Sequence, residues 1–331
     1  ALTTLPLSQD SYIPFCDDFG PLNLGTVYKF CRTMEGLLQR PDWLRHKLIY
    51  FCPLHPRVCT NAAFLLSCYM LLCRGASAKE AVAPFADIQP RPFLPYRDAT
   101  FVRSDFDLEF ESCVKGVDKA ARNGWFSMSK FDLIRYDKLS DPLFADLHEL
   151  CHKFVAFKGP VQQGEGVFDH RPNKFVSIFK ELRVTAVVRL NEVRYSSKIF
   201  TDNGIRHYDL FFEDCSVPPP NIISSFFDIC DRERRVAVHC FAGLGRTGTL
   251  IALWMMRHHG MSADEAMGWL RVVRPGCVIG EQQHFLKSCE HMQWQGNYCA
   301  TPEARKSSWR QSMCAKQLKE AMSNKRRARQ Q

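Results

Sequence analysis

Residues 236–249 combine residue types that could hold and attack a phosphate ester. Their pattern predicts a buried strand, then Cys240, a five-residue loop, Arg246 and a helix. We expect the backbone N–H groups of the loop and the positive end of the helix to converge on one dianion. Arg246 could donate two parallel hydrogen bonds to phosphate oxygens, and the same donors would stabilise a thiolate at Cys240. The loop residues, mostly small, are Phe241, Ala242, Gly243, Leu244 and Gly245.

This arrangement predicts hydrolysis by two displacements. Cys240 would attack phosphorus in line and form a phosphocysteine, which water then cleaves to inorganic phosphate. The loop and Arg246 would stabilise the transition-state charge, so the scheme needs no metal and no other cofactor. Thr247, at the start of the helix, could hydrogen-bond the thiolate as it leaves. His239 fits a buried scaffold residue better than a proton shuttle.

A general acid is expected on a loop that can cover the site. Asp214 follows a predicted strand, precedes three prolines and lies 26 residues before Cys240. Glu213 and Asp209 are alternatives in the same stretch. Each of these carboxylates could instead belong to a turn or a helix cap.

The elements that must position these residues alternate between strands and helices, which predicts a parallel sheet covered on both faces, or α/β architecture. The strands are expected at 153–157, 185–190, 206–211 and 235–240, and the helices at 173–182, 220–231 and 246–258. The first half predicts a short buried strand at 48–52 and helices at 22–39, 61–74, 77–86 and 105–123.

An internal repeat supports a two-domain organisation. A shift of 185 residues places 260–266 on 75–81 with five identities in seven, and the segment around Cys240 on 48–74. We interpret this as two copies of one fold, the alternative being a coincidental helix cap. In the first copy His55 and Asn61 replace Cys240 and Arg246. That copy should therefore be inactive and shape the substrate site.

Composition limits the class of protein. The 331 residues have room for two domains, and 46% hydrophobic with 24% charged residues is typical of a folded soluble chain. The longest apolar run, 61–73, is too short and too polar to span a bilayer, so we expect no membrane insertion. The fifteen scattered cysteines fit reduced core residues, because their spacing matches no zinc site.

The positive charge is concentrated at one end. Residues 301–331 hold nine Lys or Arg against two Glu, which accounts for +7 of the net +9. The nearly neutral remainder argues against a nucleic-acid partner. The basic run 325–329 matches a nuclear-import signal that an import receptor would bind, with a solvated chain end as the alternative.

The loop resembles the signature of the protein tyrosine phosphatase superfamily: His, Cys, five residues, Arg, then Ser or Thr. Further segments resemble the cell-division-cycle-fourteen family, the mitotic-exit dual-specificity phosphatases. These segments are 18–24, 61–65, 94–99, 200–204, 209–212 and 274–286. The resemblance implies two tandem phosphatase-like domains, each a central mostly parallel sheet flanked by helices. They would be an inactive domain at 1–128, a linker at 129–152, a catalytic domain at 153–298 and a basic tail at 299–331.

The resemblance also implies roles for single residues. Asp214 is then the acid, and the amide of Gln282 could orient the hydrolytic water. Arg97 and Asp137 would belong to the substrate site. The implied substrates are phosphoproteins modified by cyclin-dependent kinases, chiefly at phosphoserine followed by proline, with phosphothreonine and phosphotyrosine also accepted. The implied location is the nucleus or cytoplasm, including the centrosome, spindle or basal body.

Some residues depart from the family pattern. Phe241 and Glu281 stand where the family has Lys and Pro, so we expect weaker binding of the phosphate dianion. Leu139 and Ser140 replace an expected Tyr and Glu in the linker, which weakens the prediction of a basic-residue preference.

A phosphoinositide phosphatase would need cations within 241–245, and none is present. A phosphotyrosine-only enzyme would need a recognition loop that the sequence does not reveal. A non-catalytic or weakly active phosphopeptide-binding scaffold is the alternative function.

Overall fold

A five-stranded sheet in the second half of the chain carries the loop that contains Cys240. The computed structural model describes residues 12–41, 48–101, 103–162 and 170–290. The central strand is β7, and the first strand, β3, is antiparallel to β4 while the other pairs are parallel. Cys240 therefore follows the carboxyl end of the central strand. In spatial order the strands are β3 (Leu147–Glu149), β4 (Phe154–Phe157), β7 (Val236–His239), β5 (Ala186–Arg189) and β6 (Arg206–Asp209).

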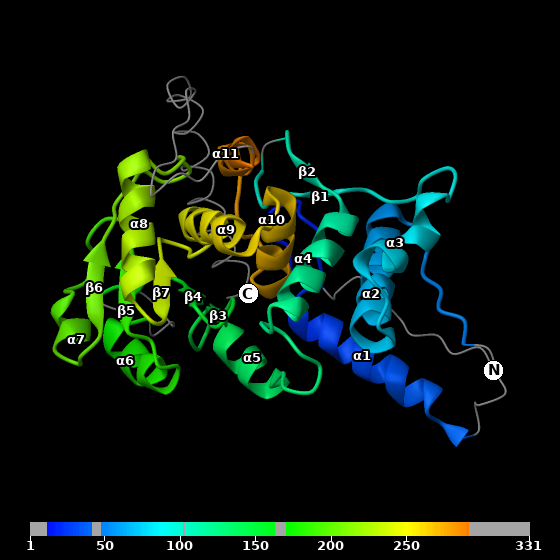
Figure 1. Ribbon diagram of the computed structural model, residues 1–331, viewed down its shortest axis with the longest axis horizontal. Coiled ribbons are helices and arrows are strands. Elements are labelled where there is room, and N and C mark those ends of the chain that lie inside the picture. The colour runs from blue at the N-terminus through cyan, green and yellow to red at the C-terminus, as the bar shows by residue number, and fades with distance from the viewer. Residues whose placement is uncertain (1–11, 42–47, 102, 163–169, 291–331) are drawn as a thin grey trace, which may run out of the picture.

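Both faces of this sheet are apolar and covered by helices (Figure 1). Alternate residues Phe154, Val188 and Val238 belong to one buried cluster with α8 (Pro220–Arg232) and α9 (Gly245–His259). Their neighbours, such as Phe157, Val187 and Ala237, face a second cluster with α6 (Pro172–Glu181) and α7 (Lys198–Thr201). Strands β4, β5 and β7 are buried on both faces and read as mainly apolar runs, which is why the sequence predicted them. The edge strand β3 was not predicted, because its segment reads as a linker. The predicted α/β class is confirmed.

The first half is mainly helical. It contains α1 (Leu24–Leu38), α2 (Pro56–Arg74), α3 (Ala78–Ala86) and α4 (Phe110–Arg122). The parallel sheet expected in each half is wrong for this one, because its described residues form only the antiparallel pair β1 (Tyr96–Arg97) and β2 (Asp107–Leu108). The strand predicted at 48–52 is also wrong. Ile49 and Phe51 are 53% and 51% exposed, and no strand in the described residues pairs with the segment.

Helix α2 begins at Pro56, earlier than the predicted residue 61. By length and composition it could cross a membrane. Its apolar side chains, such as Phe64, Leu65 and Cys68, are nevertheless buried in the same cluster as residues of α1 and α4. A core helix has this environment. The prediction of no membrane insertion is therefore kept.

The internal repeat is visible as matching helix ends. Ser77 with Glu80 and Ser262 with Glu265 form capping boxes at the starts of α3 and of α10 (Ala263–Val273). The preceding helices α2 and α9 both end at a glycine in the left-handed conformation, Gly75 and Gly260. The unit of helix, glycine and capped helix therefore occurs in both halves.

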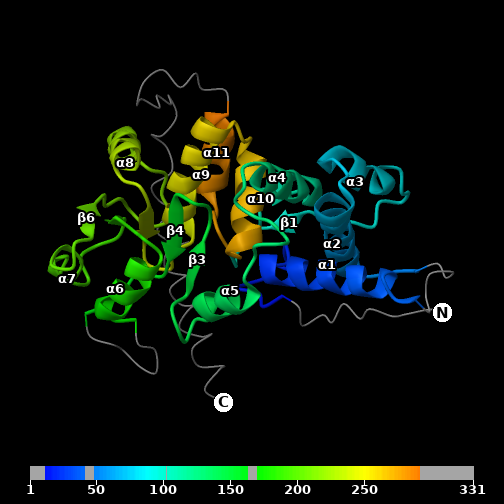
Figure 2. The same ribbon diagram turned by 60° about the horizontal axis from the view of Figure 1, so that its bottom comes forward.

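The segment predicted as a linker, 129–152, is partly built into the fold. It contains α5 (Leu133–Ser140), which lies between α1 and the sheet in Figure 2, and the edge strand β3. Tyr136 of α5 donates a hydrogen bond of 2.8 Å to the carbonyl of Val273. The domain boundaries themselves stay predictions. The basic segment 299–331, with its candidate import signal, lies outside the described residues.

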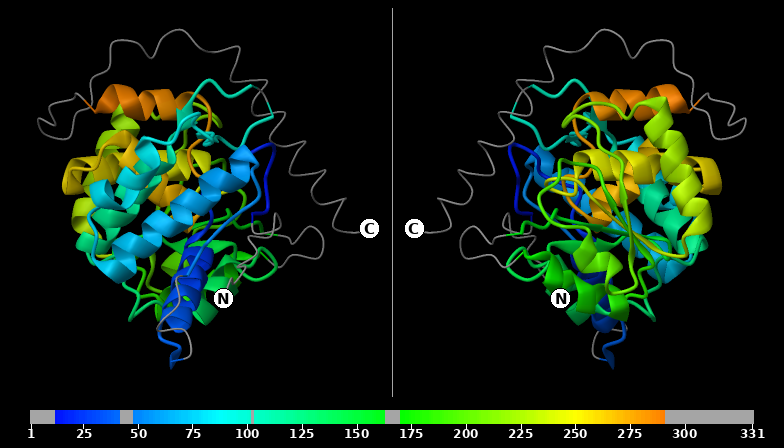
Figure 3. Two further views of the ribbon diagram at one scale, coloured as in Figure 1. Left: turned by 90° about the vertical axis from the view of Figure 1, so that its right-hand side faces the viewer. Right: turned by 90° about the vertical axis from the view of Figure 1, so that its left-hand side faces the viewer.

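The two halves share one core. Buried residues of α1, α2 and α4 belong to the same cluster as those of α9, α10 and α11 (Glu281–Cys289). Figure 3 shows α1 on one side of the molecule and α11 on the other. Helices α4 and α10 approach closely at two glycines. A Cβ on Gly116 would lie 2.4 Å from the Glu265 carbonyl oxygen, and one on Gly268 would lie 2.7 Å from the Cα of Cys113.

Gly116→Ala should therefore destabilise the protein. Because the added methyl group meets backbone, the helices must move apart, at a cost of about 1–3 kcal/mol. Gly36→Ala in α1 is the matched control: its Cβ meets nothing within 4 Å, so helix propensity should stabilise the fold by about 0.5–1 kcal/mol. Urea unfolding measures both. Equal effects of the two substitutions would contradict the tight α4–α10 contact.

Candidate active site

The carbonyl groups of the loop after β7 are all held from outside the loop. His239 Nδ1 lies 3.0 Å from the Cys240 carbonyl oxygen, and Gly159 N–H donates to the Phe241 carbonyl at 3.1 Å. The buried Arg274 donates to the carbonyls of Ala242 and Gly243 at 2.9 and 2.8 Å. These contacts fix the direction of each peptide group. Arg274 begins the segment 274–286 that resembles the family, but its role at the loop was not predicted.

The opposite edge of the loop presents unpaired donors. In the described part of the chain, none of the N–H groups of residues 241–246 donates a hydrogen bond to the protein. Helix α9 begins at Gly245, so its positive end points at the same place. Gly243 has φ +69°, and a Cβ there would lie 2.0 Å from the Phe157 carbonyl oxygen, so this position needs glycine. Such a set of converging donors binds anions.

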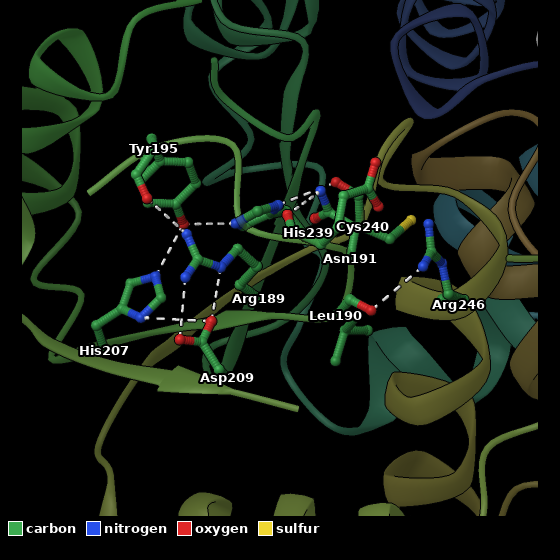
Figure 4. A network of polar contacts seen from close by, with 10 residues as sticks. Arg189, Leu190, Asn191, Tyr195, His207, Asp209, His239, Cys240 and Arg246 are labelled. Atoms are coloured by element: carbon green, nitrogen blue, oxygen red, sulfur yellow. Dashed lines mark hydrogen bonds and ion pairs between the residues drawn. The ribbon is translucent and has the colours of Figure 1, made fainter. Parts of the chain in front are cut away.

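Cys240 lines a pocket to which both halves of the chain contribute. The first half supplies Phe15 and Ala99. The second half supplies the loop and its surroundings, including the predicted residues Asp214, Phe241, Ala242, Leu244, Gly245 and Gln282. The Cys240 side chain is almost fully buried, at 3% exposure, and points towards the Arg246 guanidinium (Figure 4). An anion in this pocket would therefore contact both sulfur and guanidinium.

Arg246 is buried and fixed in place by main-chain acceptors. Its Nη1 donates to the carbonyls of Phe212 and Leu190 at 2.9 and 3.3 Å. Its Nε lies 3.2 Å from Asp214 Oδ1, an ion pair without hydrogen-bond geometry, so the Nε–H has no acceptor among the described residues. The buried hydroxyl of Thr247 is likewise without a partner there. Buried donors without acceptors are costly, and a bound anion would satisfy them.

Of the three candidate acids, only Asp214 lines the pocket. Its side chain is partly exposed, and Oδ1 also accepts a 3.1 Å hydrogen bond from the Cys215 N–H. Asp209 instead forms two contacts of 2.6 and 3.0 Å with the guanidinium of Arg189. Glu213 is exposed and is not among the lining residues. Geometry therefore favours Asp214 over the alternatives.

Gln282 and Phe241 both line the pocket and contact different neighbours. The buried Gln282 amide donates to the Ser216 carbonyl at 3.1 Å, and its Oε1 lies 2.8 Å from the Cβ position of Gly245. The guanidinium carbon of Arg194 lies 5.2 Å from the centroid of the Phe241 ring. The Arg194 guanidinium, on another loop, therefore places a positive charge beside Phe241. This charge acts against the weaker anion binding that was expected from Phe241 in place of Lys.

His239 belongs to a buried network below the loop (Figure 4). The Cys240 carbonyl can only accept, so His239 Nδ1 carries the proton and Nε2 accepts from the Tyr195 hydroxyl at 2.7 Å. The Tyr195 oxygen in turn accepts from His207 Nε2 at 2.9 Å. Burial lowers the pKa of His239 to about 3 and that of His207 to about 4. His239 is therefore neutral at physiological pH and orients the loop. Tyr195 was not predicted.

Two predicted substrate residues are not among the residues that line the pocket. Arg97 forms a 2.8 Å ion pair with Asp17 and donates to the Thr100 carbonyl at 2.9 Å. Asp137, on α5, pairs with Lys29 at 3.1 Å. The structure brings together the other predicted site residues. These contacts of Arg97 and Asp137 lie within the first half and the linker.

The buried state of His239 should make stability depend on pH. Its folded pKa lies below the unfolded value of about 6.5, so below that pH the unfolded chain binds one proton more and stability falls. His239→Asn keeps a donor near the Nδ1 position and removes the titration. Between about pH 6.5 and pH 4, the free energy of unfolding should fall less steeply for the variant than for the wild type, with a difference in slope of about 1.4 kcal/mol per pH unit. Equal slopes for the two proteins, measured by urea unfolding at several pH values, would contradict a buried neutral His239.

Comparisons with known proteins agree with this geometry. Residues 8–120 match the family model "Dual specificity protein phosphatase, N-terminal half", and residues 173–293 match "Dual specificity phosphatase, catalytic domain". Human dual specificity protein phosphatase CDC14C is 39% identical over 295 residues, covering 87% of this chain and 65% of the relative. Human CDC14A is 39% identical over 288 residues, covering 86% of this chain and 48% of the relative. The two family models identify the tandem halves.

More distant relatives include tyrosine-protein phosphatase CDC14 of Saccharomyces cerevisiae, which is 36% identical over 83% of this chain and 52% of its own length. Among solved structures, the active form of Tk-PTP is 23% identical over 44% of this chain and 95% of that chain, with a TM-score of 0.36. The chain thus spans about half to just under two thirds of the length of these curated relatives. It belongs to the CDC14 family of dual-specificity protein phosphatases.

Proposed function

We propose that this protein is a cysteine-dependent phosphoprotein phosphatase that works through a phosphocysteine intermediate. The observation that carries the proposal is a set of donors around Cys240 that have no acceptor among the described residues: the N–H groups of 241–246 and the Nε–H of Arg246. A phosphate dianion has the charge and the oxygens to satisfy them. The same field favours a thiolate, which is the nucleophile this reaction needs.

In the first step, Cys240 Sγ attacks phosphorus and the bond to the serine, threonine or tyrosine oxygen breaks. Asp214 supplies the proton to the departing oxygen, because it is the pocket carboxylate on a loop. Arg246 and the loop N–H groups hold the phosphoryl oxygens while charge spreads over them. The products are phosphocysteine and the dephosphorylated protein.

In the second step, water attacks phosphocysteine and releases inorganic phosphate and Cys240 thiolate. Gln282 orients this water, and Asp214, now ionised, accepts its proton. The Gln282 amide is buried against the loop and contacts the loop that carries Asp214 through the Ser216 carbonyl. The unpartnered hydroxyl of Thr247 donates to the departing sulfur.

The preferred substrate is phosphoserine followed by proline, as in sites made by cyclin-dependent kinases. The support is the family membership together with the apolar side of the pocket, where Phe15 and Ala99 of the first half meet Ile279. A proline ring would bury its carbons there without leaving a backbone donor unpaired. The partners are then phosphorylated proteins within the cell.

The experiment measures hydrolysis of three peptides, containing phosphoserine-proline, phosphoserine-alanine and phosphotyrosine, with a metal chelator present. Cys240→Ser should reduce turnover to near background, whereas Cys52→Ser, a cysteine outside the pocket, should not. Asp214→Ala should lose about 10²–10⁴-fold on the peptides and much less on an aryl phosphate whose leaving group needs no proton.

The outcomes separate the parts of the proposal. Equal turnover by wild type and Cys240→Ser would overturn the mechanism. An Asp214→Ala loss of the same size on all leaving groups would overturn the acid role. Faster hydrolysis of phosphotyrosine or phosphoserine-alanine than of phosphoserine-proline would overturn only the specificity. Phosphopeptide binding without wild-type turnover would identify a scaffold instead.

A further inference from the structure

We propose that Asp98, a buried carboxylate of the first half, is a positioning residue that holds Gln282 in place for the second chemical step. The inference rests on the proposed phosphatase function. It gives the first half a part in the reaction beyond shaping the pocket wall.

Asp98 reaches across the boundary between the halves. It is 3% exposed, and its Oδ2 accepts hydrogen bonds from the Gly280 N–H at 2.8 Å and from Gln283 Nε2 at 3.1 Å. Its Oδ1 accepts from the Thr100 hydroxyl at 2.8 Å. The two residues that donate to Oδ2 are 182 and 185 residues later in the chain and flank Gln282 in sequence. One oxygen therefore fixes both the backbone before Gln282 and the side chain after it.

The loop that Asp98 contacts contains residues in the left-handed backbone conformation. Val278 has φ +61° and Gly280 has φ +55°. A β-branched residue rarely adopts a left-handed conformation, so surrounding contacts must impose it. From one side the buried Arg271 donates to the carbonyls of Cys277 and Val278 at 3.0 and 2.9 Å. Asp98 supplies the restraint from the other half.

The restraints meet at Gln283. Arg271 Nη2 donates to Gln283 Oε1 at 2.6 Å, and Gln283 Nε2 donates to Asp98. This chain of contacts places a buried cation and a buried carboxylate on either side of one amide. The described contacts of the Asp98 carboxyl group are hydrogen bonds from the Gly280 N–H, the Gln283 amide and the Thr100 hydroxyl.

Gln282 sits directly between the two fixed points and against the phosphate-binding loop. Its Oε1 lies 2.8 Å from the position that a Cβ on Gly245 would take, so the amide packs on the loop at a point where a larger residue would displace it. Displacing a positioned group by about 1 Å can cost about 10²-fold in rate. Loss of the Asp98 contacts should thus affect the water-attack step, in which Gln282 acts, more than phosphoryl transfer to Cys240.

The test is burst kinetics of 4-nitrophenyl phosphate hydrolysis with the full chain. In Asp98→Ala, phosphocysteine hydrolysis should slow about 10–100-fold while the initial release of 4-nitrophenol changes little, so acid-quenched phosphoenzyme accumulates. Asp98→Asn keeps an oxygen that can accept both N–H groups and should stay within about threefold of wild type. Asp105→Ala, which removes a nearby exposed carboxylate, is the matched control and should match wild type.

Gln283→Met gives an independent route if Asp98→Ala does not fold. It breaks the link from Arg271 to Asp98 and should shift the rate-limiting step in the same direction. Equal slowing of both steps, or unchanged phosphoenzyme levels, in the folded variant would overturn the role of Asp98. If wild type itself forms no phosphoenzyme, the proposed function fails instead, so the two failures are distinguishable.

Discussion

The arrangement of peptide groups between residues 240 and 246 is the constraint on which the rest of the site depends. Each carbonyl on the outer side of this loop is held by a donor from another element, with Arg274, Gly159 and His239 as the main ones. Because a peptide group presents its N–H opposite its C=O, anchoring the carbonyls outward turns the N–H groups towards Cys240. The attraction for an anion therefore comes mainly from backbone fixed by packing, with Arg246 added at its edge.

This explains why so much buried polar structure lies behind the loop. Arg189, Tyr195 and His207 do not line the pocket, yet through His239 they hold the Cys240 carbonyl. Buried polar networks are favourable only when each member is satisfied, as these are. The first half is connected to the site in the same way. It shares the hydrophobic core with α9 and α10, and Asp98 reaches the segment that carries Gln282.

The parts of the fold encoded locally were predictable from the sequence. The run 236–240, the glycines of the loop and the paired capping boxes at Ser77 and Ser262 each determine their conformation from a few neighbouring residues. The strand expected at 48–52 failed because pairing depends on a partner strand distant in the chain, and its apolar pattern alone could not reveal that none would be adjacent.

The same reason separates the site residues that were predicted from those that were missed. Cys240, Arg246 and Thr247 follow one another in a recognisable spacing. Asp98 and Tyr195 act on the loops only because folding brings them there from 185 and 44 residues away, so spacing carries no signal for them. Arg97 and Asp137 were assigned by resemblance, and their roles in the substrate site stay predictions; the structure shows that they form ion pairs with Asp17 and Lys29.

The most direct test of this account is the rate at which iodoacetate alkylates Cys240 as pH is varied, followed by peptide mapping because the chain has fifteen cysteines. The account predicts fast alkylation at about pH 6, where an ordinary thiol with a pKa of about 8.5 is almost unreactive. It also predicts protection by vanadate, which would occupy the ring of N–H donors. Alkylation that only becomes appreciable above about pH 8, with no protection by vanadate, would contradict it.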